Sequence, residues 1–159
     1  MIDHAAAAIN AIRQLGATGL SGGKPVLLVG IDDDRTATLT AMSVLARVSP
    51  INLNAELAQA LIDAAGTRVD PASLIAGLNP DASLLLLDRI QILMLPQLKV
   101  DALDVLTRVA RRRAVCASWP GRLENGRLRY ANHNHPECFD DDAARALIID
   151  LTTNESQSR

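Results

Sequence analysis

The stretch of sequence that decides the fold is VLLVGIDDDRTATL, residues 26–39. Its first four residues are all apolar, and a continuous apolar run of this kind is typical of a strand buried on both faces of a parallel sheet. A glycine and three aspartates follow, and apolar residues then recur with a helical period over about residues 36–48. A strand, a short loop and a helix in this order predict the first unit of an α/β fold.

The same alternation of strand-like and helix-like patterns continues along the chain. Apolar runs predict further strands at 50–53, 83–87, 114–118 and 146–151, and helical periods predict helices at 4–15, 54–64, 71–78 and 96–112. We therefore expect a three-layer α/β fold, with a mainly parallel sheet and helices on both of its faces. Asn125-Gly126 is a strong two-residue turn signal, so a β-hairpin over residues 122–130 is expected as an insertion.

The chain divides into three parts. Residues 1–24 predict a helix and a Gly-rich connector, residues 25–151 the α/β domain, and residues 152–159 a polar tail. The length of 159 residues corresponds to about one domain, and the hydrophobic content of 48% excludes a disordered chain.

Composition and charge exclude several classes of function. Aromatic residues make up only 2%, which argues against stacking of single-stranded nucleic acid bases. A net charge of −2 gives no overall basic field toward DNA or membranes. Two cysteines without a CxxC pair fit a reducing compartment, and no apolar run reaches the length of about 18 residues that a membrane span needs. The N-terminal residues lack the apolar core of a signal peptide, so we expect a cytoplasmic protein.

Residues 30–36 stand where a phosphate-binding loop, GxxxxGK[ST], would lie between strand and helix. Gly30 can serve as the first glycine, and Arg35-Thr36 take the place of Lys-Ser/Thr in a loop that is one residue shorter. Asp34 replaces the second glycine, and the three carboxylates of residues 32–34 repel a triphosphate. The alternative interpretation is an ordinary acidic helix start, since the positive end of the helix dipole favours aspartate.

Two later residues complete the pattern of a P-loop core. LLLLD ends at Asp88, which is typical of an apolar strand that delivers a carboxylate to magnesium, although such an aspartate also serves as a cap. Ser118 ends the fourth predicted strand, in the position of a sensor residue. Together these motifs predict ATP and Mg²⁺ as the cofactors to test.

A response-regulator receiver is the rival interpretation of the same residues. Asp33 and Asp34 would hold magnesium, Asp88 would accept the phosphoryl group, and Ser118 would follow the fourth strand. A receiver also needs a lysine after its last strand, and ALIIDLT at 146–152 has none.

Two further groups of residues have both a chemical and a structural interpretation. Arg111-Arg112-Arg113 suit the negative end of a helix, or they act as an arginine finger toward a neighbouring subunit or as contacts to a phosphate backbone. The second group, in residues 133–138, forms either a structural zinc site, which needs four ligands, or an ordinary polar loop. The candidate ligands are His133, His135 and Cys138, with Cys116 as a fourth from a predicted strand.

Four segments carry a resemblance to a known family. They are VLLVG at 26–30, INLNAEL at 51–57, the LLLLD strand, and SWPGRLENGRLRYANHNHPE at 118–137. Over about residues 25–139 the chain resembles the small P-loop proteins of type three BREX bacteriophage-defence systems, the BrxF family. The resemblance implies a cytoplasmic AAA-like P-loop protein that acts with other BREX proteins. We expect such a protein to act through protein contacts, including those of a homo-oligomer.

The resemblance also assigns roles to individual residues. It carries Gly30, Arg35 and Thr36 over to the phosphate loop and Asp88 to the magnesium position. Family members of the P-loop type would carry Gly-Lys-Thr where this chain has Asp-Arg-Thr, and a planar guanidinium does not replace the point charge of lysine. We therefore expect weak or no nucleotide hydrolysis, with an active ATPase that has an unorthodox loop as the alternative. The most specific segment contains the residues expected to form a partner surface, which are Trp119, Tyr130 and His135.

Overall fold

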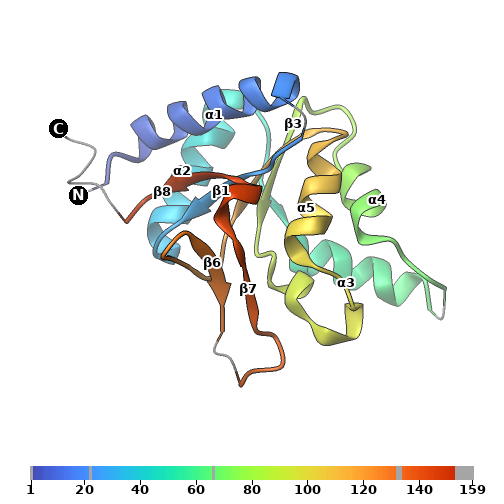
Figure 1. Ribbon diagram of the computed structural model, residues 1–159. Coiled ribbons are helices and arrows are strands. Elements are labelled where there is room, and N and C mark those ends of the chain that lie inside the picture. Colours follow the sequence, from blue (N-terminus) through green and yellow to red (C-terminus); the bar gives the residue numbers. More distant parts are fainter. Residues whose placement is uncertain (1, 22, 66, 132–133, 153–159) are drawn as a thin grey trace.

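The apolar runs of the sequence form the central sheet of the computed structural model, which describes residues 2–21, 23–65, 67–131 and 134–152 (Figure 1). The helices are α1 (His4–Ser21), α2 (Asp32–Ala46), α3 (Leu53–Asp63), α4 (Pro71–Ala76) and α5 (Ala102–Ala110), with short 3-10 helices η1 (Gln91–Met94), η2 (Pro96–Leu98) and η3 (Ala143–Arg145). The strands are β1 (Val26–Val29), β2 (Ile51–Asn52), β3 (Leu84–Asp88), β4 (Ala114–Ser118), β5 (Arg122–Glu124), β6 (Arg127–Tyr130), β7 (Phe139–Asp142) and β8 (Leu147–Asp150).

Five strands form one parallel sheet in the order β2-β3-β4-β1-β8. The predicted α/β class with a parallel sheet flanked by helices is therefore confirmed. The flavodoxin-like order of a receiver, 2-1-3-4-5, places the first strand beside the second. Here β4 and β3 separate β1 from β2, so the receiver interpretation is wrong in its topology.

The two faces of the sheet pack against different helices because side chains alternate along each strand. Leu28 and Cys116 face α1 and α2, and they belong to one buried cluster. Leu27 and Val115 face the other way, into a larger cluster that contains the apolar sides of α3, α4 and α5. Figure 1 shows the two helical layers on opposite sides of the sheet.

Several helix boundaries differ from those predicted. Helix α1 continues to Ser21 through the segment expected as a connector, since isolated glycines inside a helix are tolerated at a cost of about 1 kcal/mol each. Helix α3 begins at Leu53, and Asn52 rather than Asn54 caps it by accepting a 3.1 Å hydrogen bond from the amide of Ala55. The predicted helix at 96–112 is divided, because Lys99 takes a left-handed conformation before α5 begins.

The start of α2 is the boundary that matters most for the site. The helix begins at Asp32, four residues before the predicted start at Thr36. Its first turn contains Asp32, Asp33 and Asp34, which the positive end of the helix dipole stabilises. Only residues 30 and 31 therefore separate β1 from α2.

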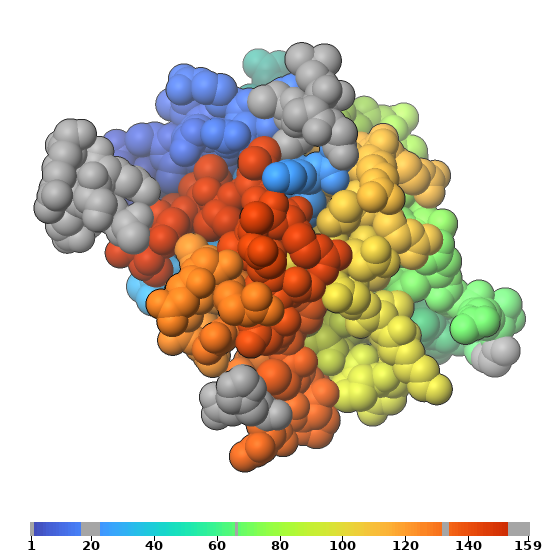
Figure 2. All heavy atoms as spheres, viewed as in Figure 1, coloured from blue at the N-terminus to red at the C-terminus, as the bar shows by residue number. Residues whose placement is uncertain are grey.

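The insertion after β4 is a three-stranded antiparallel sheet in the order β5-β6-β7, larger than the predicted hairpin. Both turn residues, Asn125 and Gly126, have positive φ as the turn signal requires. Trp119 is fully buried, its ring meets that of Phe139 edge to face at 5.3 Å, and its indole N–H donates a 3.3 Å hydrogen bond to the carbonyl of Arg129. In Figure 2 the chain from β5 onward, in orange and red, fills the middle of the visible face.

No helix within the described ranges is both long enough and apolar enough to cross a bilayer.

Gly121 allows the close approach between the Trp119 turn and β6. A Cβ at this position would overlap the carbonyl oxygen of Arg129 and lie 3.0 Å from the indole nitrogen of Trp119. We expect Gly121→Ala to lower the free energy of unfolding by about 2–4 kcal/mol, measured by urea denaturation. The matched control is Gly16→Ala in α1, where an added Cβ meets nothing within 4 Å. That variant should gain up to about 1 kcal/mol of stability. Equal stability of Gly121→Ala and the natural chain would contradict the packing described here.

Candidate functional site

The candidate site lies at the carboxyl edge of the parallel sheet, where Gly30 follows β1 and where β3 and β4 end at Asp88 and Ser118. In open α/β sheets ligands bind at this edge, where connections from adjacent strands run in opposite directions. The chain leaves β1 through α2 toward β2, and it leaves β4 through the small sheet toward β8. The expected crevice therefore lies at the ends of β1 and β4.

Arg35 fills this crevice. It lies in the first turn of α2 and is only 7% exposed. Its Nε donates a 2.9 Å hydrogen bond to the carbonyl of Gly30, and Nη1 donates a 2.7 Å hydrogen bond to the buried hydroxyl of Ser118. Its Nη2 lies 3.4 Å from the carboxylate of Asp32. One planar guanidinium thus joins the ends of β1 and β4 to the start of α2, which the single charge of a lysine could not do with the same geometry.

The charges around Arg35 are balanced inside the chain. Arg89 donates a 2.9 Å hydrogen bond from Nη1 to the same Asp32 oxygen, and its Nε lies 4.0 Å from Asp88. Burial lowers the pKa of Arg35, while Asp32 and Asp88 raise it and Arg89 lowers it further. The guanidinium of an arginine stays charged in proteins at neutral pH. Two guanidinium groups and two carboxylates therefore neutralise one another at this edge.

The remaining carboxylates of the first turn of α2 differ in their surroundings. Asp34 accepts a 2.9 Å hydrogen bond from Nε2 of His4, which fastens the start of α1 to the start of α2. Asp33 is exposed and forms no ion pair within the described part of the chain. Thr36 is also exposed, and its hydroxyl forms no hydrogen bond there.

The phosphates of a nucleotide do not fit this arrangement. A phosphate loop binds through several backbone N–H groups that a long loop directs at the anion. Here the loop has two residues, and the amide of Arg35 already donates a 3.0 Å helical hydrogen bond to the carbonyl of Ile31. The Arg35 side chain occupies the space between the strand ends, and the first-turn aspartates would repel a triphosphate.

A magnesium ion does not fit either. One Asp88 oxygen accepts a 2.9 Å hydrogen bond from the amide of Arg89, and the other faces the Arg89 guanidinium, itself a cation. Among the described residues no group of three or more His, Cys, Asp or Glu side chains is arranged to hold a metal.

The three consecutive arginines have separate surroundings. Arg113 is half-buried and donates hydrogen bonds to the carbonyls of Leu78 and Ala82, and at 2.9 Å to that of Asn79. The prediction that Arg113 serves as an arginine finger is therefore wrong, because its guanidinium fastens the loop before β3. Arg111 and Arg112 are exposed after α5, and their role as an arginine finger or as contacts to a phosphate backbone stays a prediction.

The predicted zinc ligands are not brought together. Cys116 is fully buried on the α1–α2 side of the sheet, where burial raises the pKa of its thiol, whereas Cys138 is exposed. The prediction that Cys116 is a fourth zinc ligand is therefore wrong. His135 is exposed, and its Nδ1 accepts a 3.1 Å hydrogen bond from the amide of Glu137. His133 lies outside the described residues.

The predicted partner surface is corrected in one residue. Trp119 has no exposed surface, so its ring serves the packing of the small sheet and not a partner. Tyr130 is half-buried and His135 is exposed, and their contact with a partner stays a prediction.

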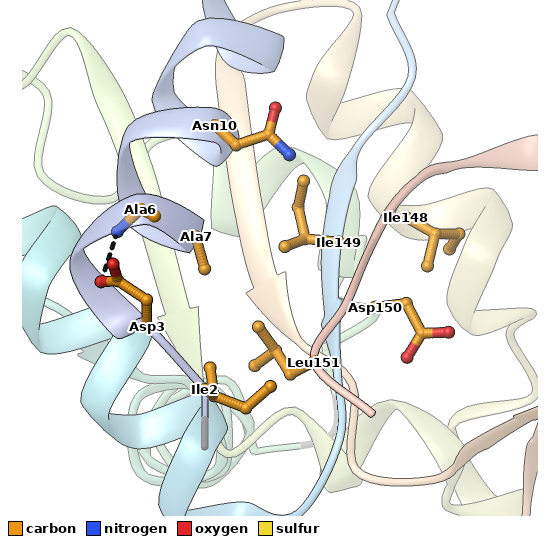
Figure 3. Close-up of a pocket in the computed structure, with 9 residues that line it drawn as sticks. All are labelled: Ile2, Asp3, Ala6, Ala7, Asn10, Ile148, Ile149, Asp150 and Leu151. Carbon is orange, nitrogen blue, oxygen red and sulfur yellow. Dashed lines mark hydrogen bonds between the residues drawn. The ribbon is translucent and has the colours of Figure 1, made fainter. Parts of the chain in front are cut away.

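Two hollows of the surface lie near the edge of the sheet. One of about 240 Å³ lies between α1 and β8, and Figure 3 shows that its aspartate from the start of α1, Asp3, is used as a local cap, at 3.0 Å from the amide of Ala6. The other, of about 270 Å³, lies beside Gly30 and Ile31, and its cation, Arg122, is paired with Glu124. Neither hollow brings several unpaired polar groups together in the way that a small-molecule site does.

Comparison with known proteins finds no matching family model, no matching curated protein and no matching solved structure.

One residue of the site, His4, was not predicted for it. Asp32 and Arg89 follow strand ends, where the rule that parallel strands end at one edge places them, but their ion pair was not predicted. The pair of His4 and Asp34 had no signal in the sequence, because it joins two helices 30 residues apart.

Removal of the Arg35 guanidinium should destabilise the fold, because it removes the contacts that join the ends of β1 and β4 to α2. Arg35→Met leaves the Ser118 hydroxyl and the Gly30 carbonyl without their donor, so we expect a loss of about 2–4 kcal/mol in the free energy of unfolding. Arg35→Lys keeps the charge but not the fork, and we expect a smaller loss of about 1–2 kcal/mol.

The control for these variants is Arg13→Met on the exposed side of α1, which should change stability by less than about 0.5 kcal/mol. Urea denaturation of the four proteins measures the differences. Equal stabilities of Arg35→Met and Arg13→Met would contradict a structural role of Arg35.

Proposed function

We propose that the chain is a P-loop-like subunit that binds and hydrolyses no nucleotide and acts through protein contacts, within a bacteriophage-defence system of the BREX type. The observation that carries the first part of the proposal is the position of Arg35. Its side chain lies where a ligand would enter between the ends of β1 and β4, and it is held there by Gly30, Ser118 and Asp32.

The order of the strands supports the relation to a P-loop core. β4 lies between β1, whose end would lead into the phosphate loop, and β3, whose end would hold magnesium. The same arrangement, with one strand between these two, belongs to the AAA-like cores that the sequence resemblance implies. The strand order is thus compatible with that family. The residues at the carboxyl edge of the sheet, however, pair with one another and not with a nucleotide or magnesium.

Internal charge pairing supports the absence of nucleotide chemistry. In an ATPase of this class a lysine and a magnesium ion neutralise the phosphates. In this chain Arg35 and Arg89 are directed at Asp32 and Asp88 instead. Entry of ATP would require the separation of these pairs and the unwinding of the first turn of α2.

The BREX setting rests on the sequence resemblance, which is most specific at 118–137. The described part of that segment builds the Trp119 turn and two of the three strands of the small sheet, β5 and β6. A subunit without nucleotide chemistry contributes to such a system by holding other proteins, and this role is the one that we propose.

A thermal unfolding experiment tests the absence of nucleotide binding. We expect the Tm of the natural chain to stay unchanged in about 5 mM ATP and Mg²⁺. Binding with a Kd of about 50 μM would add about 2.7 kcal/mol and raise the Tm by about 5–10 °C.

Asp88→Asn separates the two hypotheses because it keeps an oxygen that accepts from the Arg89 amide and removes the negative charge. A rise of the Tm with ATP that Asp88→Asn abolishes would reject the absence of nucleotide binding and would favour the alternative of an active ATPase with an unorthodox loop.

A plating experiment tests the setting. In a bacterium that carries the complete defence system with this chain, deletion of the chain should restore plaque formation. Asp88→Asn should leave defence at the natural level because no magnesium-dependent step passes through this carboxylate. Unchanged defence after the deletion would reject the BREX setting. Loss of defence in Asp88→Asn, with the protein present at its normal level, would reject the absence of nucleotide chemistry.

A further inference from the structure

The outer face of α2 carries a stripe of residues at positions 33, 37, 40, 44 and 47. The steps of four and three residues place the side chains at 33, 37, 40 and 44 on one side of the helix, and Arg47 follows α2 as its exposed C-cap, in a left-handed conformation. The stripe begins with Asp33 and ends with Arg47, and residues 36–46 contain no charged side chain. An exposed helix face in a globular protein usually carries charged residues along its length. This face therefore differs from an ordinary solvated surface.

The two charges at the ends of the stripe have no partner within the described residues. Asp32 pairs with two arginines and Asp34 pairs with His4, whereas Asp33 forms no such pair. Arg47 closes the helix with its backbone, and its side chain forms no ion pair. The two residues lie about 21 Å apart along the helix axis, so they cannot pair with each other.

Exposed apolar side chains accompany the stripe. Among the described residues five large hydrophobic side chains are exposed, and three of them belong to α1 and α2. Val44 lies on the stripe and is 73% exposed, Leu45 beside it is 53% exposed, and Ile9 on the neighbouring helix α1 is 47% exposed. The pair of His4 and Asp34 joins the starts of α1 and α2, and the two helices that carry these side chains form one layer of the fold (Figure 1).

We propose that a second copy of this chain binds here, with the two α2 helices antiparallel about a two-fold axis at Thr40. Asp33 and Arg47 lie seven residues on either side of Thr40. In this arrangement Asp33 of each copy meets Arg47 of the other, and Ala37 and Val44 of both copies lie between these charges. The same patch serves both copies, as a two-fold interface requires.

The charges select this arrangement over its alternatives. Parallel helices would bring Asp33 against Asp33 and Arg47 against Arg47, and like charges in contact are unfavourable. A strongly charged partner would find only one charge of each sign on this face, at its two ends. The charge pattern is complementary to itself after a half-turn, which favours a second copy.

The dimer goes beyond the proposed function and does not depend on it. Arg35 lies on the inner side of α2, toward the sheet, and the stripe lies on the outer side. One helix pair with its neighbours covers less than the about 1,600 Å² of a standard interface, so we expect a Kd of about 10–100 μM.

Charge reversal with sedimentation equilibrium tests the dimer. The natural chain should change from monomer to dimer as its concentration rises to about 500 μM. Asp33→Arg gives two positive ends and Arg47→Asp gives two negative ends, so each variant alone should weaken association at least about tenfold. The two variants mixed in equal amounts should form a heterodimer, and the double variant Asp33→Arg/Arg47→Asp should associate like the natural chain.

The control is Asp81→Arg, a charge reversal at an exposed residue outside α2, which should associate like the natural chain. Far-ultraviolet circular dichroism of each variant confirms that it is folded before its mass is measured. A natural chain that stays monomeric up to about 500 μM overturns the proposal. Failure of the mixture and of the double variant to recover association overturns the antiparallel pairing.

Discussion

The guanidinium group of Arg35 joins three parts of the chain that the backbone alone leaves separate. It donates to the carbonyl that follows β1, to the hydroxyl that ends β4, and toward the first carboxylate of α2. A buried charge is stable only when it is paired and its donors are used, and these contacts meet both conditions. The start of α2 at Asp32 depends on the same contacts, because the first turn must bring Arg35 back over the strand ends.

The acidic first turn has two effects that oppose nucleotide binding. Aspartates at the positive end of the dipole stabilise a helix that begins early, and this early start leaves only two loop residues between β1 and α2 and uses the amide of Arg35 in a helical hydrogen bond. Asp32 also holds Arg35 and Arg89 in place. The carboxylates of the first turn and the arginines beside them therefore act together, since each neutralises the charge of the other.

Periodicity in the sequence predicted most of the helices and strands, but it did not predict which strands are neighbours. Apolar runs identified β1, β3, β4 and β8 because fully buried strands have a distinct composition. The start of α2 was wrong because aspartate is favoured both in loops and in first turns, so DDD fits either. β7, with the sequence FDDD, lacks an apolar alternation and was missed. The positions at strand ends identified Arg35, Asp88 and Ser118 as site residues. The contacts that these residues make could not be predicted, because they depend on the order of the strands.

The excess of arginine over lysine has a structural explanation in this chain. Arg35 and Arg113 each bind several acceptors with one planar group, and each fastens a segment against the sheet. A lysine has no planar group with several N–H donors in fixed directions, so it could not bind the same acceptors at once. Because Arg35 fixes the inner side of α2, the outer side is held rigid before any partner arrives. A rigid surface loses less conformational entropy on association, so the contacts that close the crevice also favour assembly through the opposite face of the same helix.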